Sequence, residues 1–486
     1  MQYSTVRAAV HIASVFAIYL SFAMLAPAAV DLYRGNDDWT VFAFSAFFTG
    51  GLALGGALAT QGKPPPISSR FGFLVVNLLW LTTSAVGTVP LYASASLDLT
   101  LAEAAFEAVS GITTTGATIV NGLDDLPPGI LLWRSLLQWM GGLGVIAFSL
   151  FVLPFLNVGG ISYFRIETSD ITDRPFERLS THITALIGIY SATTVLCAVL
   201  YTAAGMGGFD ALNHALTTIS TAGFSTHDAS MGVYGDNFAI LWIATVFMFL
   251  GALPFSIMML LVVSGRLDTL RDPQIRVFAG YVVAFVAAVA LYLRLTGDMA
   301  FGPALTYAAF NFVSLITTTG FATGDYTEWG PFVAGCALVA TVLGGCSGST
   351  SGGVKAYRFL ILFKLLANGL KRFVYPNAVV TVHYGDRPVD DAMQRAVVLF
   401  ISAFLSIWLI LTLLLTAAGI DILSALSGAL TCLTNVGPGL GEMIGPAGNF
   451  SAVPDTAKWL LALGMLLGRL EILAVLVVFT PVFWRR

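Results

Sequence analysis

Four short segments of the chain share one pattern, in which small or hydroxylated residues precede a glycine. They lie at 113–118 (TTTGAT), 220–225 (STAGFS), 317–322 (TTTGFA) and 434–439 (TNVGPG). Glycine adopts positive φ at little steric cost, so alternating backbone conformations can turn successive carbonyl oxygens toward one side. Such oxygens can replace the water shell of a monovalent cation. The four segments therefore predict cation coordination by the backbone rather than covalent chemistry.

A second candidate feature is the glycine- and serine-rich run GGCSGSTSGGVK at 344–355, inside an apolar stretch. Each Gly costs about 1 kcal/mol relative to Ala in a helix interior, so the helix must break there. Irregular backbone at membrane depth is tolerated only where it is buried in protein or lines a wet cavity. Lys355 follows the run and is expected to mark its cytoplasmic end.

A third candidate feature is Arg469, about halfway along the last apolar stretch. A central arginine costs roughly 3 kcal/mol on insertion scales, so it should face a pore or a partner rather than lipid. The alternative to a pore role is a structural pair with Glu471 or with loop carbonyls. Arg134 lies near the outer end of another apolar stretch and is expected to reach the interface as a snorkelling residue.

Two other chemistries fit parts of the chain. The GCSG sequence at 345–348 matches the GxSG pattern of intramembrane serine proteases, with Ser347 as nucleophile and His11 as the histidine deepest in a span. No second motif supports that interpretation. A carrier coupled to Na⁺ or H⁺ would need a buried carboxylate, for which Glu471 is the main candidate.

The composition indicates whether the surface of the protein faces water or lipid. Hydrophobic residues make up 57% of the 486 residues and charged residues only 10%, whereas soluble domains carry about 25% charged residues. A water-soluble globular protein is therefore excluded. The net charge of −4 comes without a dense basic run, which argues against nucleic acid. The four Cys are far apart and form no CxxC pair, so neither structural zinc nor a disulfide framework is indicated.

The apolar stretches predict an all-α polytopic membrane protein with ten spanning helices, because a span needs about 20 mostly apolar residues. The spans lie near 8–30, 39–60, 71–93, 129–156, 180–204, 237–263, 277–297, 330–366, 395–418 and 456–484. Four shorter apolar pieces, near 101–114, 209–220, 303–317 and 421–434, lead directly into the glycine segments. These pieces are too short to cross, so we expect half-membrane helices that enter and return on one side.

The positions of Lys and Arg predict the orientation. Basic residues collect at 61–72, 157–179, 264–276 and 355–395, whereas the loops that hold the short helices have almost none. The positive-inside rule therefore places both termini in the cytoplasm and the entrances of the half-helices outside.

The spacing of the glycines predicts a fourfold internal repeat. Gly116, Gly223, Gly320 and Gly437 are 107, 97 and 117 residues apart. Each repeat would contain a helix, a pore helix, a glycine segment and a second helix, and parallel repeats can close around a central pore. The predicted divisions are 1–62 for an N-terminal helix pair, then 63–160, 161–265, 266–372 and 373–486 for repeats one to four.

These residues resemble the Trk, Ktr and HKT family of potassium transporters, and the leading helix pair is most like its TrkH members. The resemblance rests on the four glycine segments, on the 344–355 run and on LLGRLEIL at 466–473. It implies potassium uptake, not enzymatic activity, across a bacterial inner membrane by a homodimer, with no cofactor. It also implies a cytoplasmic TrkA-type nucleotide-binding ring, for which the basic loops at 264–276 and 355–395 are the expected contacts. The loop 157–179 is mixed in charge and is not assigned as a contact.

The resemblance also assigns site residues by position. The residues implied to bind K⁺ are Thr113, Thr114, Thr115, Gly116, Ser220, Thr221, Ala222, Gly223, Thr317, Thr318, Thr319, Gly320, Thr434, Asn435, Val436 and Gly437. The residues implied to gate the pore are Gly344, Gly345, Ser347, Gly348, Ser349, Gly352, Gly353, Lys355 and Arg469. Pro438 stands where repeats two and three have phenylalanine, so the ring should be less symmetric at the fourth repeat.

Polar side chains nine residues before the glycines form a last set of candidates. These positions hold Glu107, His214, Asn311 and Gly428. Two interpretations are open for them: polar support behind the glycine segments through hydrogen bonds to their backbone, and ordinary helix packing or exposure at the outer mouth.

Overall fold

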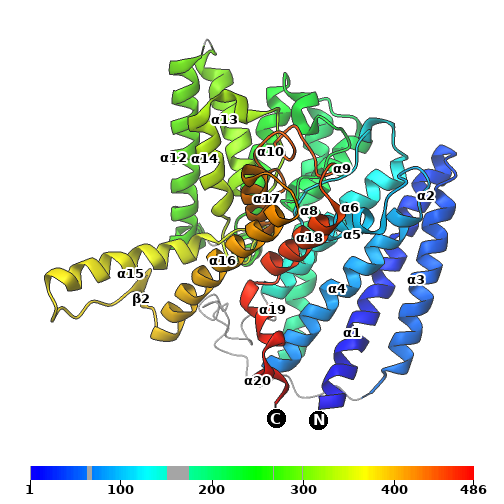
Figure 1. Ribbon diagram of the computed structural model, residues 1–486, viewed down its shortest axis with the longest axis horizontal. Coiled ribbons are helices and arrows are strands. Elements are labelled where there is room, and N and C mark those ends of the chain that lie inside the picture. The colour runs from blue at the N-terminus through cyan, green and yellow to red at the C-terminus, as the bar shows by residue number, and fades with distance from the viewer. Residues whose placement is uncertain (1, 63–67, 150–174, 266, 298, 486) are drawn as a thin grey trace.

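The computed structural model describes residues 2–62, 68–149, 175–265, 267–297 and 299–485. The described chain is a bundle of α-helices, with both termini at the same end of the molecule (Figure 1). Its strands are β1 (His383–Tyr384) and β2 (Arg387–Pro388), which form one antiparallel hairpin. The predicted all-α class is therefore confirmed. The loop predicted at 157–179, Lys63 and Arg266 lie wholly or largely outside the described residues.

Seven of the ten predicted spans are long and apolar enough to cross a membrane without a sharp bend, counted over the described residues. The first of them combines α1 (Gln2–Ala23) with α2 (Leu25–Arg34). The others are α3 (Trp39–Ala59), α4 (Ser69–Ala93), α6 (Pro128–Ala147), α8 (Pro175–Ala203), α12 (Pro273–Thr296) and α16 (Asp391–Ala417). Many of their outward side chains, such as Phe22, Phe47 and Leu295, are exposed, as lipid-facing residues are.

Three predicted spans are broken. The stretch 237–263 divides into α10 (Phe238–Gly251) and α11 (Phe255–Ser264), bent by 99°, and 456–484 divides into α18 (Asp455–Arg469), α19 (Ile472–Phe479) and a short α20 (Pro481–Trp484), with 108° between α18 and α19. The stretch 330–366 divides into α14 (Pro331–Val342) and α15 (Ala356–Val374), and α15 extends away from the bundle at the lower left of Figure 1. The breaks in 237–263 and 456–484 contradict the prediction of continuous spans, whereas the break in 330–366 was predicted from its glycine-rich run.

The four short helices form where they were expected. They are α5 (Leu101–Ile112), α9 (Gly208–Ile219), α13 (Phe301–Ile316) and α17 (Ile422–Thr434). Thr100 and Glu103 form a capping box that starts α5, and the Asp421 carboxylate caps α17 by accepting from Ser424 N–H. All four helices are almost completely buried from their second turn onward. Protein surrounds them on all sides, which explains why they are apolar although they are too short to cross a membrane.

Each half-helix packs between the long helices before and after it and also against a helix of the preceding group. The cross-group contacts are α9 with α6, α13 with α10, α17 with α14, and α5 with α18. The last contact joins the beginning of the series to its end, so the four groups are arranged in a closed cycle. Of the four predicted boundaries between groups, those at 62/63 and 265/266 lie next to undescribed residues, and the one at 160/161 lies among them. The boundary at 372/373 falls within the last turn of α15.

Candidate functional site

The half-helices end in four loops that follow the same backbone course. We name them glycine loop 1 (113–118), loop 2 (220–225), loop 3 (317–322) and loop 4 (434–439). In each loop the glycine and the residue two before it have positive φ. The pairs are Thr114 (54°) and Gly116 (80°), Thr221 (48°) and Gly223 (80°), Thr318 (60°) and Gly320 (85°), and Asn435 (58°) and Gly437 (109°). The alternation predicted from the glycines is therefore present in all four loops.

One backbone hydrogen bond recurs where each half-helix ends. The N–H of the residue before the glycine donates to the carbonyl five residues earlier. These bonds are Thr115 to Ser110 (2.9 Å), Ala222 to Thr217 (2.9 Å), Thr319 to Ser314 (2.8 Å) and Val436 to Thr431 (3.0 Å). The bond closes the helix over a left-handed residue, in the manner of a Schellman cap. It helps to hold a conformation that costs a non-glycine residue on the order of 1–3 kcal/mol.

The glycine loops contact one another in a closed ring. A Cβ at Gly116 would overlap the Ala222 carbonyl oxygen of loop 2, one at Gly223 would overlap Thr319 O of loop 3, and one at Gly320 would overlap Val436 O of loop 4. A Cβ at Gly437 would lie 2.8 Å from Thr115 O of loop 1, which closes the cycle. Each loop thus presents a carbonyl oxygen where its neighbour has no side chain. The structure brings all sixteen predicted ion-binding residues together at this ring.

Two of the predicted half-helix side chains hold the chain three residues beyond the glycine. Glu107 Oε2 on α5 accepts from the Ile119 N–H at 2.9 Å. Asn311 Oδ1 on α13 accepts from the Thr323 N–H at 3.2 Å, and its Nδ2 donates to Thr323 Oγ1 at 2.7 Å. Both side chains are fully buried. These contacts provide polar support behind the loops, and neither side chain is exposed at the outer mouth.

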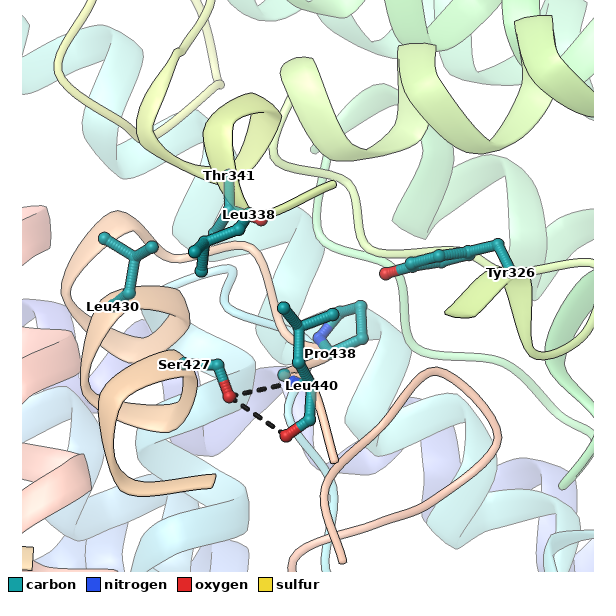
Figure 2. Close-up of a pocket in the computed structure, with 8 residues that line it drawn as sticks. Tyr326, Leu338, Thr341, Ser427, Leu430, Pro438 and Leu440 are labelled. Carbon is teal, nitrogen blue, oxygen red and sulfur yellow. Dashed lines mark hydrogen bonds between the residues drawn. The ribbon is translucent and has the colours of Figure 1, made fainter. Parts of the chain in front are cut away.

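The other two half-helices reach the same part of the loop with different side chains. His214 Nε2 on α9 lies 3.0 Å from Ser225 Oγ, two residues after the glycine. Gly428 has no side chain, and Ser427 replaces it: its Oγ accepts from Leu440 N–H at 2.9 Å and donates to Leu440 O at 3.1 Å (Figure 2). Ser427 was not predicted, because it lies ten residues before Gly437 and the predicted polar positions lie nine residues before each glycine.

Loop 4 departs from the other three, as its Pro438 suggested. Pro438 lines a small cavity together with Ser427 and Tyr326 (Figure 2). Asn435 supplies contacts that the threonines of the other loops cannot: its Nδ2 donates to Thr115 Oγ1 and to Met465 O, both at 3.0 Å.

Two further side chains that hold the loops come from α6. Arg134 is 1% exposed, and its Nε donates to Glu107 Oε1 at 2.8 Å, so the prediction of a snorkelling residue was wrong. Gln138 is fully buried; its Nε2 donates to Ala222 O at 2.7 Å, and its Oε1 accepts from Phe224 N–H at 2.9 Å. One lone pair of the Ala222 carbonyl is therefore occupied within the protein. A glutamine in the middle of an apolar span was the signal that could have identified this residue.

The 344–355 run lies directly against the ring. Thr221 Oγ1 of loop 2 donates to Thr350 Oγ1 at 3.0 Å. The Gly352 N–H donates to Thr318 Oγ1 of loop 3 at 2.6 Å, and the Gly353 N–H donates to the Thr434 carbonyl of loop 4 at 2.8 Å. We name residues 343–355, between α14 and α15, the intramembrane loop. It contacts three of the four glycine loops and occupies one of the predicted ion-binding carbonyls, that of Thr434.

Cations gather beside the intramembrane loop. Lys355 is 8% exposed, and its Nζ donates to Ser351 O. Arg469, at the break between α18 and α19, is 5% exposed, and its three guanidinium nitrogens have no hydrogen-bond partner among the described residues. Both line one cavity with Gly352. Glu471, the structural partner that the sequence suggested for Arg469, instead forms an ion pair with the buried Arg358. Arg469 therefore has no hydrogen-bond partner among the described residues, and Glu471 lines the same cavity as Arg469 and Lys355.

The contacts of Ser347 do not support the protease interpretation. The Ser347 N–H donates to Gln274 Oε1 at 2.9 Å, and the loop around it is held by α10 and α11. His11, the base that this interpretation would need, instead has its Nδ1 3.0 Å from Ala57 O on α3.

A charged cluster lies beyond the ring, in the loops that follow α5 and α9. His227 Nδ1 is 2.5 Å from Asp124 Oδ1, and His227 Nε2 is 3.6 Å from Asp210 Oδ2. Pairing with Asp210 and then Asp124 raises the pKa of His227 to about 9, although burial opposes this. The hydrogen bond from His227 lowers the pKa of Asp124. His227 is therefore a cation at neutral pH, and it links the loop after α5 to the start of α9.

Comparison with known proteins agrees with this geometry. A sequence profile of the TrkH family, described as cation transport protein, matches residues 40–485. The chain is 40% identical to the Trk system potassium uptake protein TrkI of Halomonas elongata, over 96% of this chain and 95% of that protein. It is 39% identical to the Salmonella typhimurium TrkH, over 99% of each chain. The crystal structure of the potassium transporter TrkH from Vibrio parahaemolyticus superposes over the full length of both chains, with a TM-score of 0.92 and 36% identity.

Proposed function

The chain belongs to the TrkH family of cation transport proteins, and we propose that it carries potassium into a bacterial cell, across the inner membrane, through the ring of glycine loops. The single observation that supports this most is the closure of the ring. Each of the four glycines leaves room for a carbonyl oxygen of the next loop, in the order one, two, three, four and back to one. As a transport protein, the chain is not an enzyme.

The ring would select its ion through backbone oxygens. Carbonyl dipoles can replace the hydration shell of K⁺. The half-helices add to this, because the carboxyl end of a helix carries roughly −0.5 of an elementary charge. The carbonyl oxygens of Thr115, Thr319 and Val436 are the strongest candidates, since each lies at the empty side of a neighbouring glycine.

The intramembrane loop would act as the gate. Its hydrogen bonds to Thr221, Thr318 and Thr434 place peptide and hydroxyl groups against the ring. Arg469 and Lys355 add two positive charges in the cavity beside it. A cation leaving the ring would meet both obstacles, so opening requires the loop to move. We propose Gly344, Gly345, Gly348 and Gly353 as the positions that allow this movement.

The remaining parts of the assignment rest on the family resemblance and on charge. We propose four parallel repeats after an N-terminal helix pair, a homodimer with one pore in each subunit, and cytoplasmic termini. A TrkA-type regulatory ring would contact the basic cytoplasmic segments, including α15 and the β1–β2 hairpin. We favour passive flux over coupling to Na⁺ or H⁺, because Glu107 and Glu471 are both held in ion pairs with arginine.

Growth of a potassium-uptake-deficient bacterium at low external K⁺ tests the proposed function. The chain is expressed with its regulatory partner, and the partner expressed alone is the control. We expect growth at micromolar to low millimolar K⁺ that the control does not support. If the chain and its partner, both present in the membrane, restore no growth and no K⁺ uptake, the proposed function is wrong.

A further inference from the structure

The ion pair between Glu107 and Arg134 does more than neutralise two buried charges. Arg134 uses its other two nitrogens on different loops: Nη2 donates to Thr118 Oγ1 of loop 1 at 3.0 Å, and Nη1 donates to the Ser225 carbonyl of loop 2 at 3.1 Å. Its guanidinium carbon lies 4.2 Å from the ring centroid of Phe224, also in loop 2. One planar side chain therefore connects two neighbouring loops.

Glu107 fixes this arginine in place and holds loop 1 from the other side. Its Oε1 accepts from Arg134 Nε and from Thr118 Oγ1, at 2.8 and 2.9 Å, and its Oε2 accepts from the Ile119 N–H. Both carboxylate oxygens are thus used, and the side chain is fully buried. Charge-assisted hydrogen bonds of this kind are strong and directional.

The other three half-helices are held differently. His214, Asn311 and Ser427 each bond to the loop that follows their own helix. Their bonds position one loop relative to its own half-helix. The Glu107–Arg134 pair adds a connection between repeats, from α5 through α6 to loop 2.

The distance between neighbouring loops matters for ion selectivity. A ring of carbonyls discriminates K⁺ from Na⁺ by the size of its cavity or by the number and field strength of its oxygens. Both properties change when one loop shifts relative to the next. Arg134 and Glu107 lie behind the loops, so they would act as positioning residues and not as ligands.

We propose that the Glu107–Arg134 pair sets the spacing between loops 1 and 2 and thereby determines how strongly the ring prefers K⁺ over Na⁺. This inference rests on the proposed function, because it assigns a selectivity role within the same ring. It does not depend on the intramembrane loop or on any partner protein.

The double variant Glu107→Gln with Arg134→Met separates positioning from simple folding. Removing both charges leaves no unpaired buried ion, so the protein should fold. It also removes the contacts to Thr118 and Ser225. We expect the ratio of K⁺ to Na⁺ uptake to fall by about tenfold, which corresponds to 1.4 kcal/mol of discrimination. A purely structural pair predicts an unchanged ratio once the double variant folds, and that result would overturn the proposal.

Arg134→Lys is the second variant. Lysine keeps the positive charge beside Glu107, but one ammonium group cannot reproduce the planar fork that reaches both loops. We expect correct folding and a reduced ratio of K⁺ to Na⁺ uptake. An unchanged ratio in this variant also contradicts the proposal. Arg294→Met, at an exposed position in the last turn of α12, is the matched control and should keep the original ratio.

Ion-dependent thermal stability of the purified protein gives a readout that does not require transport. An ion that binds the folded ring raises the unfolding temperature. The unmodified protein should be stabilised more by K⁺ than by Na⁺, and the double variant should lose most of that difference. If the unmodified protein transports K⁺ while the double variant keeps both the uptake ratio and the stabilisation difference, the proposed function stands and this inference fails.

Discussion

The glycines of the ring are required for a steric reason that can be tested at one position. Gly116 has φ of 80°, and a Cβ there would overlap Ala222 O. Gly122 has φ of 69°, but a Cβ added there would have no atom within 4 Å. Both sites therefore impose the conformational cost of about 1–2 kcal/mol on a substituted residue, but only Gly116 has a neighbouring loop in the way.

Gly116→Ser should therefore reduce the preference for K⁺ over Na⁺ by about tenfold or more, equivalent to at least 1.4 kcal/mol. Gly122→Ser is the control, with equal backbone strain and open space, and should keep the preference. Competition between K⁺ and Na⁺ for uptake measures both. Equal effects of the two substitutions would mean that backbone strain, not the carbonyl contact, explains the loss.

Arg469 is the residue whose removal should make conduction easier. It is buried beside the ring, and its guanidinium nitrogens lack partners among the described residues. We expect Arg469→Ala to raise K⁺ flux several-fold, because a positive charge in the exit cavity repels the ion. Arg469→Lys keeps the charge and should stay near the original flux. Unchanged flux in a well-expressed Arg469→Ala protein would remove its assigned role.

The His227 cluster gives a pH-dependent stability with a defined sign. The pKa of His227 is raised from 6.5 to about 9, so its contribution is fully present below pH 6.5 and is lost as the pH rises through 9. We expect His227→Gln to destabilise the protein by on the order of 2 kcal/mol near pH 6, since a tenfold change in proton affinity is about 1.4 kcal/mol and partial exposure screens the pair.

Thermal unfolding of both proteins between pH 6 and 10 measures this effect. The difference between His227→Gln and the unmodified protein should shrink as the pH approaches 10. A difference that stays constant across this range would show that His227 acts by packing against Tyr234 rather than by its charge.

The residues that carry the site were predictable only in part. Gly116 and its three equivalents could be found from repetition, because no other residue type satisfies positive φ with a carbonyl at the Cβ position. The roles of Arg134 and Gln138 were not recognised, because their partners in loop 2, Ser225 and Ala222, lie 91 and 84 residues away and only the folded chain brings them together. Ser427 was missed because α17 carries its polar side chain ten residues before the glycine, and the other half-helices carry theirs nine residues before it.

At the level of elements, the broken helices and the intramembrane loop provide hydrogen-bond partners for each other's backbone groups. The break between α10 and α11 exposes backbone groups that lipid could not hydrogen-bond. The loop provides partners: Cys346 N–H donates to Ala252 O at 2.9 Å, and Phe255 N–H donates to Gly348 O at 3.0 Å. The glycine-rich composition predicted the break near 344–353. The 99° bend between α10 and α11 could not be derived from Gly251 and Pro254 alone, because it depends on the hydrogen bonds between this break and the intramembrane loop.

The Thr350 side chain connects the intramembrane loop to α9, α10 and glycine loop 2. Its Oγ1 lies 2.9 Å from Gly251 O and 3.1 Å from Ile219 O, so its single O–H donates to one of them or is shared between them, and it accepts from Thr221 Oγ1. Thr350→Val keeps the shape but removes the hydrogen bonds of this buried hydroxyl, at a cost of about 1–3 kcal/mol. We expect the loop to leave the ring more often and K⁺ flux without the activating partner to rise several-fold.

Thr245→Val is the control for Thr350→Val. The Thr245 Oγ1 donates to Leu241 O within α10 at 2.7 Å, so its loss should not release the loop from α10. Flux through reconstituted protein in vesicles, measured with and without the regulatory partner, compares the two variants. If they behave alike, Thr350 does not hold the gate.

For the whole molecule, the sequence predicted the architecture through repetition. Four short apolar helices before four glycines required loops at membrane depth, and such loops need a shared interior. The cyclic contacts of α9 with α6, α13 with α10, α17 with α14 and α5 with α18 agree with that expectation. The path of α15 away from the bundle was not predictable, since its amphipathic sequence suits several surfaces.

We propose that peptide oxygens of four converging loops hold a dehydrated potassium ion. Anomalous diffraction from crystals of the protein grown with Rb⁺ or Tl⁺ in place of K⁺ can locate such an ion. We expect a strong anomalous peak at the centre of the ring, surrounded by carbonyl oxygens of the four loops, that weakens when Na⁺ is in excess. A well-ordered ring with no peak on its axis, at ion concentrations that support uptake, would contradict the proposal.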